Sequence, residues 1–341
     1  MSQELNKRIV RVVLDDLFRE TSYQYFAEVS GFEGHMVDYD VSPIRIESAE
    51  QEIARKTSMV SEMRRSGKAL SAVYPDGNTR AIRSLTAEGD RVVAEYFTYG
   101  GRTIFRDDED HKFHCVKIFE LRDSKIVRMR EYCDSAYLTD FGSDISRYMH
   151  ETPAGGVDQN ALDHSSWGTS WLLRSDKMEL GPEDGTVDGS AELDENRRIA
   201  RVVVERWGSR ESADHLHDDV LFSNEVDLRN TPALGRAVHG KNALATVHER
   251  VAELFPGGVE HRITAVTAEE NRVAVEEIIS GMSPLRPDKP FRVPALKILF
   301  FRDGKVFRVR QHLDSGFIQA YAPEAVEYVF GTTDAVPAFA Q

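Results

Sequence analysis

Glu131, Lys117 and Tyr96 are residue types that together can move a proton and hold an oxygen atom. Successive side chains of a strand point to opposite faces, so Glu131 shares its face with the apolar Met129 and Cys133. Lys117 interrupts a second apolar face, and pairing the two apolar faces brings it within reach of Glu131. Burial raises the pKa of a carboxyl group and a nearby lysine lowers it, a balance that can leave a base near working pH.

We therefore expect Glu131 to move the proton and Lys117 to set its pKa or hold a developing oxyanion. Tyr96 is expected to donate a hydrogen bond to a substrate oxygen. The apolar residues of these faces that we expect to contact substrate are Met129, Cys133 and Phe119. The alternative is a salt bridge that neutralises itself at the rim of a pocket.

The chain also contains an internal repeat, which shows which elements must position these residues. The order of three matching blocks is kept, and their offset drifts only from 190 to 180 residues. The pairs of blocks are Asn6–Val13 with Asn196–Val203, Ala87–Val92 with Ala268–Val273, and Lys117–Ser135 with Lys297–Ser315. We interpret the chain as a tandem duplication.

The second copy carries related but different candidates. Lys297 corresponds to Lys117, whereas Gln311 replaces Glu131 and cannot exchange a proton, so a base there must be Glu277. Asn224 could orient a water or a substrate oxygen. Either this copy runs different chemistry, or Glu277 and Lys297 are a remnant ion pair; we favour a structural copy.

Each copy has the same succession of elements: a helix, a short strand, a second helix and a strand-rich block. The opening helices present Ile9, Val12, Val13 and Leu17, and Ile199, Val202, Val203 and Trp207, at helical spacing. The short strands are expected at His35–Val41 and Val220–Val226, and the second helices at Ser48–Met63 and Asn242–Leu254. The later strands are expected at 91–99, 113–121 and 125–134, and at 272–280, 293–301 and 305–314. This pattern predicts an α+β fold, with two tandem cone-shaped domains whose helices pack on a curved, mainly antiparallel sheet.

The succession of elements, with strands such as Arg130-Glu131-Tyr132-Cys133-Asp134 and the His217–Phe222 segment, resembles the nuclear-transport-factor-2-like cone in its SnoaL-like and limonene-epoxide-hydrolase-like branches. The resemblance implies a deep apolar cone with a few ionisable groups and usually no cofactor. The fold hosts isomerases, cyclases, dehydratases, lyases, epoxide hydrolases and binding proteins.

The resemblance suggests roles for Glu131 and for the pair Asp38 and Asp40. Glu131 resembles the catalytic carboxylate of the epoxide-hydrolase branch, but Tyr96 and Thr98 stand where that branch carries Arg-x-Asp. Asp38 and Asp40 lie on the strand that holds the general base in the ketosteroid-isomerase-like branch, and we count them as candidates for substrate binding.

The domain boundaries follow from composition. Residues 1–150 and 191–325 are expected to be the two SnoaL-like cones, and residues 326–341 a tail. Residues 151–190 are rich in Gly, Ser and Asp and read as a connector that packs on a domain, as a surface crossover or a lid.

Charge and cysteine content exclude several classes. The net charge of −14 over 341 residues, without a dense Lys/Arg stripe, argues against nucleic acid as a partner. Two cysteines cannot build a disulfide framework or a cysteine zinc site, and we expect no metal. The charged start is unlike a signal peptide and no apolar run is long enough to span a membrane, so we expect a soluble cytoplasmic protein.

The leading hypothesis is a cofactor-independent lyase, isomerase or dehydratase acting on a hydrophobic aromatic, polyketide or terpenoid compound. The alternative is a non-catalytic ligand-binding or assembly module, and the third option an epoxide hydrolase. Contacts between the repeats, or between two chains, are expected through the convex sheet faces, where Arg128 and Arg130 lie.

Overall fold

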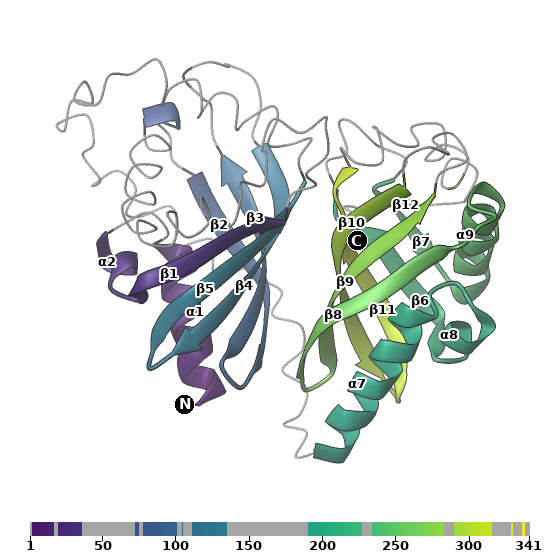
Figure 1. Ribbon diagram of the computed structural model, residues 1–341, viewed down its shortest axis with the longest axis horizontal. Helices are drawn as coiled ribbons and strands as arrows, with labels where there is room; N and C mark the ends of the chain where they lie inside the picture. Colours follow the sequence, from purple (N-terminus) through teal and green to yellow (C-terminus); the bar gives the residue numbers. More distant parts are fainter. Residues whose placement is uncertain are drawn as a thin grey trace. The chain divides into compact units, whose positions relative to one another are not determined.

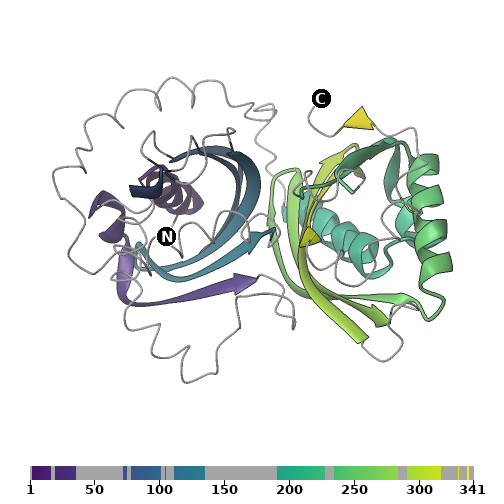
Figure 2. The same cartoon turned by 90° about the horizontal axis from the view of Figure 1, so that it is seen from above.

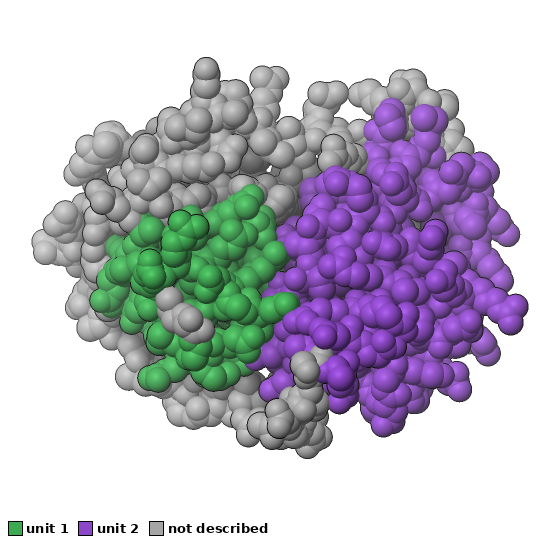
Figure 3. Space-filling view, turned by 60° about the horizontal axis from the view of Figure 1, so that its bottom comes forward, with its two compact units in different colours: residues 1–34, 45–131, 137–184 green, residues 35–44, 132–136, 185–341 purple. Residues whose placement is uncertain are grey.

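The chain divides into two compact units, which Figure 3 colours separately. Unit 1 comprises residues 1–34, 45–131 and 137–184, and unit 2 comprises residues 35–44, 132–136 and 185–341. The computed structural model describes residues 2–16, 20–35, 72–74, 78–100, 104, 111–134, 190–226, 234–282, 290–315, 329 and 336–337.

The described N-terminal part contains two helices and one sheet of five strands in the order β1-β5-β4-β3-β2 (Figure 1). Its elements are α1 (Gln3–Asp15), α2 (Glu20–Tyr23), β1 (Phe26–His35), β2 (Asn78–Glu88), β3 (Arg91–Gly100), β4 (His111–Arg122) and β5 (Lys125–Cys133). Strands β2, β3, β4 and β5 lie side by side in chain order, as expected for consecutive hairpins.

The C-terminal part repeats this arrangement with more elements. Its sheet has the order β12-β7-β6-β11-β10-β9-β8, in which β11 pairs in parallel with β6. Its elements are α7 (Ser190–Glu205), α8 (Arg210–Asp214), β6 (Leu216–Asn224), β7 (Arg236–His239), α9 (Lys241–Leu254), β8 (Val259–Glu269), β9 (Arg272–Met282), β10 (Pro290–Arg302), β11 (Lys305–His312) and β12 (Val336–Pro337). Seen from above, both sheets are curved (Figure 2). The predicted α+β class is confirmed.

The opening helix of each part is fixed by its apolar stripe and by one asparagine. Helix α1 buries Ile9, Val10, Val13 and Leu14, and α7 buries Ile199, Ala200, Val203 and Val204. The buried Asn6 donates to the carbonyl of Gly89 at 2.9 Å, and Asn196 donates to the carbonyl of Glu270 at 3.3 Å. In both parts the repeated asparagine therefore ties the helix to the turn of a hairpin. Val12, which was expected on the buried stripe, is exposed instead, because the stripe is centred on Val10 and Val13.

Matching irregularities shape the two sheets. The register shifts between Ile82 and Ser84 in β2, and between Ile263 and Ala265 in β8. The β4–β5 turn has positive φ at Asp123 and Ser124, and the β10–β11 turn has it at Asp303 and Gly304. Two successive positive φ values are typical of the tight hairpin turns whose twist suits a twisted sheet.

Several predicted elements are shifted or were missed. The first strand runs over Phe26–His35 rather than starting at His35, and residues 36–41 and the expected helix at 48–63 lie outside the described residues. The second copy's first strand starts at Leu216 instead of Val220. Strands β2 and β8 were not predicted. Within the expected tail, Val329 is buried in the core and Val336–Pro337 pairs with β7. The expected connector lies outside the described residues up to residue 189.

None of the helices described by the structure is long and apolar enough to cross a membrane.

Candidate active site

The register of the C-terminal sheet gathers polar side chains on its concave face. Lys297 of β10 lies opposite Val275 on one side and Gln311 on the other, and Gln311 lies opposite Asn224 of β6. Glu277 follows Val275 by two residues on β9, so it shares the face of Lys297 and lies diagonal to it.

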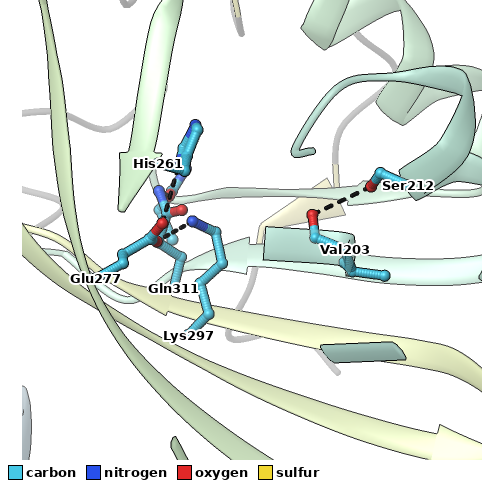
Figure 4. Close-up of polar contacts among 7 residues, drawn as sticks. Val203, Ser212, His261, Glu277, Lys297 and Gln311 are labelled. Atoms are coloured by element: carbon cyan, nitrogen blue, oxygen red, sulfur yellow. Dashed lines mark hydrogen bonds and ion pairs between the residues drawn. The ribbon is translucent and has the colours of Figure 1, made fainter. Parts of the chain in front are cut away.

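His261 completes this group from β8. Its strand partner is Ile279, and the next residue on the same face, Ile263, lies opposite Glu277. Glu277 is therefore bordered by β8 on one side and by β10 on the other. Figure 4 shows His261, Glu277, Lys297 and Gln311 pointing toward one another.

These side chains form two contact groups that lie side by side on the sheet, and we call them together the C-terminal polar cluster, defined as Asn224, His261, Glu277, Lys297 and Gln311. One carboxylate oxygen of Glu277 lies 2.8 Å from His261 Nδ1, and the other accepts from Lys297 Nζ. The Gln311 amide donates to Asn224 Oδ1 at 2.9 Å, and the Asn224 amide donates to the carbonyl of Leu234 at 3.1 Å.

Burial differs within the cluster in a way that matters for chemistry. The side chains of Glu277 and Lys297 have no exposed surface, whereas that of His261 keeps 8%. His261 is thus the most exposed of these three side chains.

The electrostatics of the trio follow from this burial. Burial acts to raise the pKa of Glu277, but Lys297 and the contact with His261 outweigh it, so this pKa lies below its ordinary value. Burial lowers the pKa of Lys297, against the attraction of Glu277. Burial and the charge of Lys297 lower the pKa of His261, which Glu277 partly offsets. His261 is therefore neutral at pH 7, beside an ionised carboxylate.

Apolar side chains lie on either side of the polar cluster along the same strands. Val275, Leu299, Val309 and Phe222 belong to the main core beneath α7 and α9. On the other side lies a second apolar cluster, which contains Ile279, Phe291, Val293 and Ala295, with Phe255, Val259 and Leu313 packed against it. A polar belt between two apolar regions suits a hydrophobic molecule that carries one reactive polar group.

The N-terminal sheet places the predicted trio together in a different arrangement. Lys117 Nζ lies 2.5 Å from Glu131 Oε1, and the Tyr96 hydroxyl donates to the same oxygen at 3.1 Å. The Glu131 side chain keeps 21% of its surface exposed, against 6% for Lys117. Arg130, on the opposite face, pairs with Glu120 at 2.7 Å.

The other predicted residues fall into three groups. Met129 and Phe119 are buried and Cys133 is partly buried, and their contact with substrate stays a prediction. Asp38 and Asp40 lie outside the described residues. Glu277, Lys297, Asn224 and Gln311 meet in the C-terminal cluster.

His261 was missed because its strand was missed. Partly buried and exposed residues alternate from Val259 to Thr264, as is typical of a strand, but the bulge before Ala265 interrupts the alternation. Within the described part of the chain, no three His, Cys, Asp or Glu residues are grouped as metal ligands would be.

Residues 203–309, which span most of the C-terminal sheet, match the family model of the SnoaL-like domain. No curated protein matches the chain.

Among solved structures, a putative SnoaL-like polyketide cyclase from Jannaschia sp. CCS1 is 20% identical, with a TM-score of 0.33 over 41% of this chain and 99% of that one. A protein with a ketosteroid isomerase-like fold from Catenulispora acidiphila is 16% identical, with a TM-score of 0.32 over 38% of this chain and 95% of that one. A phenazine biosynthesis-related protein from Pseudomonas aeruginosa is 15% identical, with a TM-score of 0.33 over 42% of this chain and 91% of that one.

Proposed function

Residues 203–309 are a SnoaL-like domain, and from that premise we propose that the chain is a cofactor-independent acid–base enzyme acting on a hydrophobic small molecule. The observation that carries the proposal is the contact of His261 Nδ1 with the buried Glu277 carboxylate, itself paired with Lys297. The reaction class is proton abstraction beside a carbonyl group, leading to isomerisation, cyclisation or elimination.

The roles follow from the order of contacts. An ionised carboxylate at Nδ1 holds the proton there, so the lone pair of the neutral ring is at Nε2. Glu277 thus selects the tautomer in which His261 is a base. Lys297 keeps Glu277 ionised inside an apolar environment, where an unpaired carboxylate would otherwise take up a proton.

The proton transfer needs no co-reactant, because the same proton is taken up and returned. His261 Nε2 takes a proton from carbon, the C–H electron pair enters the carbonyl system as an enolate, and the imidazolium returns the proton to a second carbon. Glu277 stabilises the imidazolium while it exists. The apolar cluster around Phe291 and Ile279 would hold the rest of the molecule.

Deuterium exchange tests this proposal without knowledge of the natural substrate. We would incubate the protein with 2-tetralone, a bicyclic ketone with acidic C–H groups, in D2O and follow the loss of proton signals by NMR. The wild-type chain should accelerate exchange, and His261→Gln should lower that rate by about 10²–10⁴-fold. His239→Gln is the matched control, because His239 is exposed on β7 of the same sheet. Equal exchange by wild type and His261→Gln would contradict the proposal.

The N-terminal trio is a second candidate, favoured by the exposure of Glu131. Lys117 and Tyr96 both contact Oε1 of Glu131, and the 21% exposure of this side chain would let a ligand reach the carboxylate. The trio suits either a second acid–base site, with Glu131 as base, or a non-catalytic ligand-binding site. Glu131→Gln in the same exchange experiment separates the two: a slower rate favours catalysis by this copy, and weaker ligand binding at an unchanged rate favours a binding module.

A further inference from the structure

A second histidine, His248 on helix α9, lies close to the C-terminal polar cluster without belonging to its hydrogen bonds. Its Nε2 atom is buried and has no hydrogen-bond partner among the residues that the structure describes. A buried polar atom left unpaired costs free energy, and each such atom in a native structure needs an explanation, of which a partner supplied by a ligand is one.

The ring of His248 is held in place by the turn that follows helix α7. It packs against the ring of Trp207, with centroids 5.0 Å apart and an interplanar angle of 73°. Gly208 comes so near that a Cβ atom on it would lie 3.2 Å from His248 Cγ. His248 is therefore positioned by the fold, although its Nε2 is unsatisfied.

Trp207 also connects His248 to the cluster. Lys297 Nζ lies 5.0 Å from the centroid of the same indole ring. Burial lowers the pKa of His248 to about 4, with further contributions from the charge of Lys297 and from His261 in its protonated form. At neutral pH the ring of His248 is therefore uncharged.

We infer that His248 Nε2–H donates a hydrogen bond to a carbonyl or phenol oxygen of the substrate, which makes the substrate class hydrophobic ketones and their enols. The inference rests on the proposed function, because it concerns the same site. Proton abstraction by His261 transfers the C–H electron pair toward the carbonyl oxygen, and the negative charge that develops there needs a donor. A neutral imidazole can fill that role. Its N–H keeps the proton, and the hydrogen bond from this N–H becomes stronger as the substrate oxygen becomes anionic.

The binding experiment uses 2-naphthol, a stable aromatic counterpart of the enol of 2-tetralone. We would measure its affinity by fluorescence titration and follow the ring nitrogens of ¹⁵N-histidine-labelled protein by NMR. Binding should shift the His248 Nε2 resonance, and His248→Phe should weaken affinity about 3- to 10-fold. His248→Gln, whose amide can still donate, should recover part of the loss, and His239→Gln should bind as wild type does.

The outcomes separate this inference from the proposed function. If 2-naphthol does not bind, if its binding leaves the His248 Nε2 resonance unmoved, or if His248→Phe binds it as tightly as wild type does, His248 is not the oxygen-binding group. Should His261→Gln retain ketone exchange while His248→Phe still weakens 2-naphthol binding, the base assignment fails and the oxygen site stands.

Discussion

Lys117 and Lys297 occupy the same position in the two sheets, yet they pair with carboxylates from opposite neighbouring strands. Lys117 lies opposite Ala94 and contacts Glu131 of β5, whereas Lys297 lies opposite Val275 and contacts Glu277 of β9. In each sheet a lysine–carboxylate pair therefore interrupts an apolar face. The carboxylate comes from β5 in the N-terminal sheet and from β9 in the C-terminal sheet, which flank the lysine strand on opposite sides. Because the carboxylate reaches the lysine from a different side in each sheet, we expect the two sites to act on different ligands or by different chemistry.

Removing one carboxylate from each pair should affect stability very differently. Glu277→Gln leaves Lys297 fully buried without a counter-charge, which typically costs about 3–5 kcal/mol in the free energy of unfolding. Glu131→Gln should cost less, on the order of 1 kcal/mol, because the Glu131 side chain is 21% exposed and water screens the change. Urea unfolding of the two variants measures both values.

The double variant Glu277→Gln with Lys297→Met is the control for this explanation. Replacing the lysine by an apolar side chain of similar length removes the unpaired charge, so the double variant should be more stable than Glu277→Gln alone. A double variant no more stable than the single one would mean that packing, not charge, explains the loss.

The N-terminal site shows how much can be predicted from the alternation of side chains along strands alone. Alternation along β3, β4 and β5 was enough to predict that Tyr96, Lys117 and Glu131 share a face, and the structure places them in contact. Alternation describes which face a side chain is on and not how deeply it is buried, so it does not distinguish the two lysine–carboxylate pairs. Glu277 and Lys297 are more deeply buried than Glu131, and that depends on helices and loops far away in the sequence.

His261 and His248 are site residues that the alternation of side chains along strands does not predict. A bulge shifts the alternation of side chains in β8 just after His261, so the sequence of this strand has no regular alternating pattern that would predict it. His248 lies on a helix, and its proximity to Trp207 and Lys297 arises only from packing. Neither relationship is encoded in a local spacing of residues.

The rate of ketone exchange should depend on pH through His261. The base must be neutral, and burial together with Lys297 lowers its pKa below the ordinary 6.5. The midpoint of the decline in exchange rate should therefore lie below pH 6.5. Lys297→Met removes one cause of the lowered pKa and should move the decline to higher pH. A decline centred above pH 6.5 in the wild type would show that another group is the base.

Stability should fall on acidification because His248 resists protonation in the folded state. Its pKa is about 4 when folded, against about 6.5 for an unfolded histidine, so the unfolded chain binds more protons between these values. The contribution is fully present above pH 6.5 and is lost as pH falls to 4, by up to about 3 kcal/mol.

His248→Phe isolates this contribution, because the variant cannot titrate at this position. The free energy of unfolding should fall less steeply between pH 6.5 and 4 in the variant than in the wild type. Asp15, whose pKa is raised to about 6 by burial and by Asp16, acts in the opposite sense, but it is present in both proteins and cancels in the difference. Equal slopes would contradict a buried neutral His248.

Gly208→Ala tests whether the position of His248 matters for binding. Gly208 has φ of +83°, and Gly304 in the β10–β11 turn has φ of +69°. Alanine in either place should cost about 1–2 kcal/mol, since this region of backbone space is unfavourable for a side chain. Only at Gly208 does the new Cβ also meet another side chain, 3.2 Å from His248 Cγ, whereas at Gly304 nothing lies within 4 Å. Both variants should therefore lose similar stability, but Gly208→Ala alone should displace the His248 ring and weaken 2-naphthol binding. Equal 2-naphthol affinity in the two variants would show that the site tolerates movement of His248, and the role of this ring in holding the substrate oxygen would have to be abandoned.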